Sequence, residues 1–231
     1  MDFERNVAIS PVATETRFLT RVYGWMSAGL VTTAVVAMLT LSSPAVLQFI
    51  FGNKLVFWGL VLGELGLVVW LSGMVGRLSA SAASAVFLVY SALNGLTLSA
   101  IFLVYTSGSI ASTFFVTAGT FGAMSIYGLT TKRSLDGLGS FCMMGLIGVI
   151  LAGIVNMFVR NSMLEFVVSC VGVLVFVGLT AYDTAKLKAI GAALDADSEQ
   201  GRRGAISGAL ALYLDFINLF LMLLRLFGRR R

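Results

Sequence analysis

Three carboxylates, Glu64, Asp183 and Asp215, lie inside long apolar runs of this 231-residue chain. Ionisable side chains at membrane depth are costly and usually face the interior of a helix bundle or a water-filled cavity. Each of the three is therefore a candidate for proton or ion chemistry. The alternative for each is a carboxylate that is hydrogen-bonded to neighbouring helices and serves packing alone.

Asp183 and Asp215 lie on consecutive apolar runs, which would cross a membrane in opposite directions. If their side chains meet, both cannot ionise cheaply, and the pair titrates as a unit. Such a pair is suited to pH sensing and, when doubly ionised, attracts a cation such as calcium, which prefers oxygen ligands. Asn218 and Arg225 follow Asp215 at helical spacing on the same stripe. Whether the two aspartates touch stays open at this point.

The runs that carry these residues are long enough to be transmembrane helices. The chain is 58% hydrophobic and 12% charged, and about 20 apolar residues suffice for one span. We therefore predict an all-α, polytopic bundle of seven transmembrane helices that forms one domain over residues 21–231, preceded by a short cytoplasmic tail at residues 1–20. The predicted spans are Val22–Leu41, Leu55–Val75, Ala80–Tyr105, Ile110–Thr130, Gly139–Val159, Phe166–Asp183 and Ile206–Phe227.

The distribution of cations predicts the orientation of the bundle. With the N-terminus inside, the inner segments hold ten Lys and Arg residues and the outer loops hold two, as the positive-inside rule requires. Arg225 and the three arginines at residues 229–231 would then lie outside, against the rule, unless the last span is re-entrant. The segment from Thr184 to Ala205 is predicted to be a solvated loop, and no cleavable signal peptide is evident.

Several classes of function are excluded or disfavoured by composition. The chain has no histidine, which excludes a histidine-based metal site or catalytic triad. Its two cysteines lie in apolar runs, and no cofactor is expected. The net charge of +5 is explained better by anchoring to the lipid bilayer at its inner leaflet than by binding to nucleic acid.

Three segments resemble the Bax inhibitor-1 family of membrane proteins, and its short bacterial inner-membrane members above all. They are GLTAYDTAKLK at residues 178–188, LYLDFINLFL at 212–221 with LLRLFG at 223–228, and VYSALNGLTL at 89–98. The resemblance extends over nearly the whole chain from Tyr23 onward. It implies a bundle whose last helix is held centrally among the other six.

The resemblance also implies a function and roles for particular residues. The family's pH-sensing aspartates match Asp183 and Asp215, and the implied activity is a pH-sensitive calcium leak without enzymatic activity. Glu64 matches an acid of the second span, here a candidate for the ion pathway. Arg77 is the candidate for a basic latch on the aspartates, although its spacing from Glu64 is longer than the family pattern implies.

Other functions remain compatible with the residues. A regulatory membrane protein that binds a membrane protease or a cell-death factor would offer the N-terminal tail to its partner. An intramembrane aspartyl protease could use two carboxylates that share a proton. The second aspartate, however, follows Leu212-Tyr213-Leu214 in place of the Gly-x-Gly of such proteases. A proton-coupled transporter is less favoured because the spans lack proline interruptions.

Overall fold

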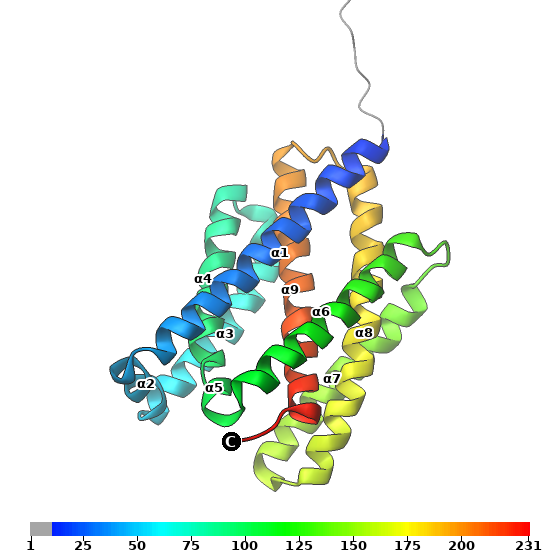
Figure 1. Cartoon of the computed structure of the whole chain (residues 1–231). Coiled ribbons are helices and arrows are strands. Elements are labelled where there is room, and N and C mark those ends of the chain that lie inside the picture. The colour runs from blue at the N-terminus through cyan, green and yellow to red at the C-terminus, as the bar shows by residue number, and fades with distance from the viewer. Residues whose placement is uncertain (1–10) are drawn as a thin grey trace, which may run out of the picture.

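A computed structural model describes residues 11–231, and over this range the chain is helical with short connections (Figure 1). The predicted tail at residues 1–20 falls partly outside this range, and its described part belongs to the first helix. The elements are α1 (Pro11–Leu41), α2 (Pro44–Phe51), α3 (Lys54–Met74), the 3-10 helix η1 (Val75–Arg77), α4 (Ala80–Leu98), α5 (Ile101–Val104), α6 (Ser107–Thr130), α7 (Asp136–Val159), α8 (Ser162–Ala193) and α9 (Glu199–Phe227).

The prediction of seven membrane spans in an all-α fold is confirmed. Within residues 11–231, seven helical segments are long and apolar enough to cross a membrane. The predicted loop from Thr184 to Ala205 is wrong, because α8 continues to Ala193 and α9 begins at Glu199. Hydropathy marks where a helix leaves the lipid, whereas the helix itself can continue into water with polar side chains.

The last helix is the centre of the bundle. In Figure 1 α9, orange to red, lies between the other helices, and it packs against α8, α1, α6 and α4. Of the most apolar stretch of α9, 61% is buried, compared with 6% for α3. The side chains of α9 therefore face protein on most sides, which is the arrangement that the resemblance implied.

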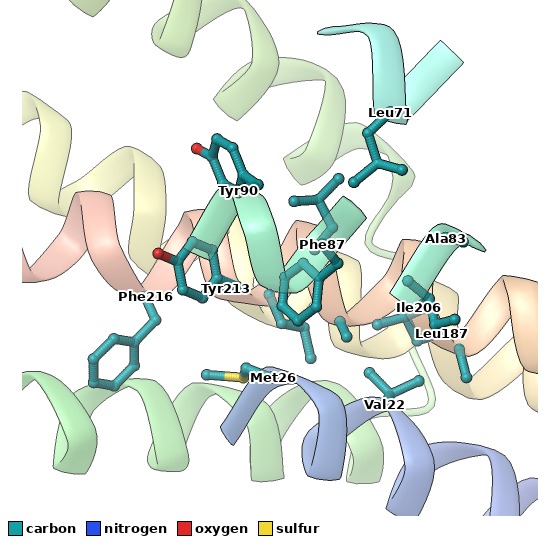
Figure 2. Close-up of a cluster of buried hydrophobic side chains, with 14 of the residues drawn as sticks. Val22, Met26, Leu71, Ala83, Phe87, Tyr90, Leu187, Ile206, Tyr213 and Phe216 are labelled. Carbon is teal, nitrogen blue, oxygen red and sulfur yellow. The ribbon is translucent and has the colours of Figure 1, made fainter. Parts of the chain in front are cut away.

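A cluster of aromatic side chains anchors α9 to α1 and α4 (Figure 2). The Tyr213 ring is fully buried and meets Phe87 and Tyr90 edge to face, at centroid distances of 5.7 and 5.9 Å. Its hydroxyl is 2.7 Å from Oγ1 of Thr33 on α1. The polar tip of a buried tyrosine thus has a partner, as such groups require.

The α8–α9 connection and the first turns of α9 contact three other elements, α1, η1 and α4, at one end of the bundle. Arg21 on α1 donates hydrogen bonds to the Asp197 carboxylate and to the carbonyl of Ala196. Arg203 on α9 donates to the carbonyl of Gly76 at 2.5 Å, and the backbone N–H of Ala80 donates to Glu199 Oε1 at 2.6 Å. We call this end, which the cation distribution predicts to be cytoplasmic, the inner end.

The C-terminal residues lie at the opposite, outer end of the bundle (Figure 1). They pack against the α5–α6 connection, where Thr106 N–H donates to the Arg229 carbonyl at 3.0 Å and Arg231 N–H donates to the Val104 carbonyl at 2.9 Å. Arg230 also pairs with Glu165 at 3.4 Å. The α9 helix therefore crosses the whole bundle, and a re-entrant last span is wrong.

The Asp197 carboxylate provides a test of the inner-end connection. The hydrogen bond from Arg21, with the charges of Arg21 and Arg17, holds the pKa of Asp197 below its ordinary value of 3.8. A lowered pKa stabilises the fold above the unfolded value, and the contribution is lost as pH falls through the folded one. We expect Asp197→Asn to cause a small fall in thermal stability that is equal at about pH 5.5 and about pH 8. Thermal unfolding in detergent at both pH values measures this, and a pH-dependent difference would contradict it.

Candidate functional site

The structure brings the two predicted aspartates together. Asp183 on α8 and Asp215 on α9 lie within side-chain hydrogen-bond reach of each other. Asp215 is 5% exposed, and its Oδ2 has no hydrogen-bond partner among the described residues. Because an ionised carboxylate only accepts hydrogen bonds, a bond between these two groups requires one of them to be protonated.

Close packing of α8 and α9 makes this contact possible. The two helices are antiparallel neighbours, and they approach closely where Gly208 of α9 lies against Leu187 of α8. In a membrane the exclusion of water does not drive helices together, so their association relies on close packing. Small residues permit such packing because they let two backbones approach. The missing side chain at Gly208 therefore leaves room for Leu187 in the contact between the two helices.

The aspartate pair lines a cavity of about 480 Å³ between four helices. Leu65 of α3 and Ile150 of α7 form part of its apolar wall, and Asn218 and Arg225 continue the polar stripe of α9. The predicted stripe from Asp215 through Asn218 to Arg225 thus faces one cavity. The amide of Asn218 donates to the carbonyl of Leu214 at 2.8 Å, which leaves its side-chain oxygen as an acceptor.

Two further cavities share lining residues with this one, and one lies toward each end of the bundle. Toward the inner end, Asp183 also lines a cavity of about 200 Å³ that includes Lys186. Toward the outer end, Arg225 also lines a cavity of about 580 Å³ that includes Glu165 and Asn156. The aspartate pair therefore lies between an inner and an outer cavity. Sequence reasoning did not assign a role to Lys186 or Glu165.

The two remaining candidates lie apart from the pair. Glu64 is buried at the α3–α4 contact and accepts a hydrogen bond from Thr97 Oγ1, while its neighbour Leu65 reaches the central cavity. Arg77 lies exposed in η1, and within residues 11–231 it forms no ion pair with Asp183 or Asp215. The basic group that contacts this segment is Arg203, which donates to the carbonyls of Gly76 and Leu78.

Comparison with known proteins identifies the family. The model of the family described as inhibitor of apoptosis-promoting Bax1 matches residues 15–231. The chain is 53% identical over 224 residues to the inner membrane protein YbhL of Escherichia coli K12, with 96% of each chain covered. It is 48% identical over 215 residues to an uncharacterised protein of Borreliella burgdorferi, with 93% of each covered.

These matches cover the membrane domain, and the fold agrees with them. The matched region begins within α1 and includes every predicted span. The descriptions of the family and of these relatives name no enzymatic activity. The chain is therefore a multi-pass bacterial inner-membrane protein that belongs to the Bax inhibitor family.

Proposed function

We propose that this protein is a pH-sensitive cation leak, with calcium as the ion and the aspartate pair as its sensor and gate. The observation that carries the proposal is the position of Asp183 and Asp215, which both line the central cavity, between the inner and the outer one. A membrane protein that only needed a packing contact at this depth would gain nothing from two adjoining carboxyl groups that open onto cavities.

The chemistry of the pair supports gating by protons. With one proton present, a hydrogen bond between the carboxyl groups holds α8 and α9 together beside the cavity. With both groups ionised, two like charges repel each other in a poorly hydrated site. The ionised pair also attracts a divalent cation, but it offers fewer oxygens than the roughly six to eight that calcium takes. Calcium would therefore keep part of its hydration shell and pass through without being held.

The experiment is calcium flux in proteoliposomes that contain the purified full chain, from about pH 5.5 to about pH 8. We expect a calcium flux that exceeds that of protein-free liposomes and changes with pH. The same flux at every pH would contradict pH gating, and no flux above the protein-free background would overturn the leak itself. Cleavage of a membrane-anchored test substrate would instead favour an intramembrane protease.

Arg225 is expected to oppose the flux, because its positive charge lines both the central and the outer cavity. A divalent ion about 10 Å from one cation in a water-like medium is repelled by about 0.8 kcal/mol, or about fourfold in occupancy. We expect Arg225→Gln to raise calcium flux by about that factor, as measured in the same liposomes. Arg225→Lys is the charge-preserving control, and an equal rise in both variants would contradict the electrostatic explanation.

A further inference from the structure

A basic pocket lies at the inner end, between the α6–α7 connection and α8. Its volume is about 370 Å³, and it is lined by four cations, Lys132, Arg133, Lys186 and Lys188. Asp136 also lines it, so four positive charges and one negative charge leave an excess of three positive charges. The two groups of cations are far apart in the sequence and meet because α6 and α7 both pack against α8.

Close helix packing holds the walls of this pocket in place. Lys188 Nζ donates a hydrogen bond to the carbonyl of Leu129 at 2.7 Å, which ties α8 to the end of α6. At Gly128 an added Cβ would lie 2.5 Å from the carbonyl oxygen of Ala181, so the two backbones are in direct contact. The pocket is therefore formed before any ligand arrives, which lowers the cost of ordering on binding.

The charges in the pocket are left open to an anion. Lys132, Arg133 and Lys186 form no ion pair with any residue in the described range 11–231. Ser134 Oγ donates to the Asp136 carboxylate at 2.8 Å, which occupies the one acidic group of the lining. Thr131 and Tyr182 also line the pocket. Ammonium and guanidinium donors around one pocket suit the oxygens of a phosphate group.

We propose that this pocket binds the phosphate of an anionic phospholipid headgroup at the inner leaflet. It lies where α6, α7 and α8 reach the inner end, and basic pockets between transmembrane helices on the cytoplasmic side accept such headgroups. Leu138 and Phe141 come next along α7 after the pocket residue Asp136. Their exposed apolar side chains offer a surface for acyl chains. A soluble phosphate ester shares the headgroup chemistry but does not need this apolar surface.

The test measures lipid binding to the full-length protein in detergent by native mass spectrometry. The probes are dioleoylphosphatidylglycerol, dioleoylphosphatidylcholine and glycerol 3-phosphate. We expect phosphatidylglycerol to bind more tightly than phosphatidylcholine, and the double variant Lys132→Gln/Arg133→Gln to bind it roughly 25-fold more weakly. The matched control is Arg77→Gln/Arg202→Gln, which removes two inner-end cations outside the pocket and should change binding by less than about threefold.

The results answer two questions separately: whether the pocket binds phosphate, and which molecule carries that phosphate. If millimolar glycerol 3-phosphate displaces phosphatidylglycerol, the pocket is a phosphate site, but its ligand is a soluble phosphate ester and the assignment to a lipid is overturned. Equal binding of the two lipids, or equal losses in both double variants, would overturn the proposal. Lys132→Arg/Arg133→Lys keeps both charges and should bind as the wild type does, which separates loss of charge from loss of fold. None of these measurements depends on ion flux.

Discussion

Replacement of either aspartate of the pair by asparagine is expected to flatten the pH dependence of calcium flux. In Asp215→Asn the amide donates a hydrogen bond to Asp183 without a proton from solution, so the contact between α8 and α9 no longer responds to pH. A one-proton gate changes flux by up to about tenfold per pH unit. We expect the variants to vary by less than about twofold across the range from about pH 5.5 to about pH 8.

The chain supplies its own matched control for this experiment. Asp197 is an exposed carboxylate at the inner end, and its lowered pKa keeps it ionised across the whole assay range. Asp197→Asn makes the same exchange of a carboxyl group for an amide as Asp215→Asn but should leave the shape of the pH profile unchanged. A profile in Asp215→Asn and Asp183→Asn that matches the wild type would remove the pair from the sensing role, whatever the absolute flux.

Removal of the ring at the centre of the bundle is expected to be the most destabilising single substitution considered. Tyr213 is fully buried against Phe87 and Tyr90, and large-to-small changes of aromatic core residues cost about 3 to 5 kcal/mol. In lipid the hydrophobic part of that cost shrinks, because both environments are apolar, so lost packing contacts dominate. We expect Tyr213→Ala to destabilise by about 3 kcal/mol.

Tyr213→Phe separates packing from hydrogen bonding at the same position. It keeps the ring and removes only the hydroxyl that meets Thr33 at 2.7 Å, and hydrogen bonds between transmembrane helices average about 0.6 kcal/mol. Reversible unfolding of both variants in mixed detergent, followed by far-UV circular dichroism, compares the two free energies of unfolding. A loss in Tyr213→Phe as large as that in Tyr213→Ala would show that the hydroxyl, and not the ring, anchors α9.

The two predictions address different parts of α9. Tyr213 faces the aromatic cluster shared with α1 and α4 (Figure 2), whereas Asp215 faces α8 and the central cavity. Residues two positions apart on a helix do not share a face. The Asp215 substitutions should therefore alter flux with little effect on stability, and Tyr213→Phe should leave the pH profile of flux intact.

Sequence alone determined the class and the span count of this protein. A bilayer demands about 20 apolar residues for each crossing, which is a property of consecutive residues and can be read without knowledge of any contact. The same logic singled out Glu64, Asp183 and Asp215, since a charge in an apolar run stands out locally. It placed the end of α8 too early, because the edge of the membrane is not the end of a helix.

Only the tertiary structure decided which of these residues act together. Contact between Asp183 and Asp215, and the separation of Glu64 from them, depend on the rotation and relative depth of whole helices. The basic pocket joins Lys132 and Lys186 from distant segments, because Gly128 lets α6 approach α8. Such placements result from side-chain packing between helices, and a pattern along one chain segment does not encode the position of its neighbour.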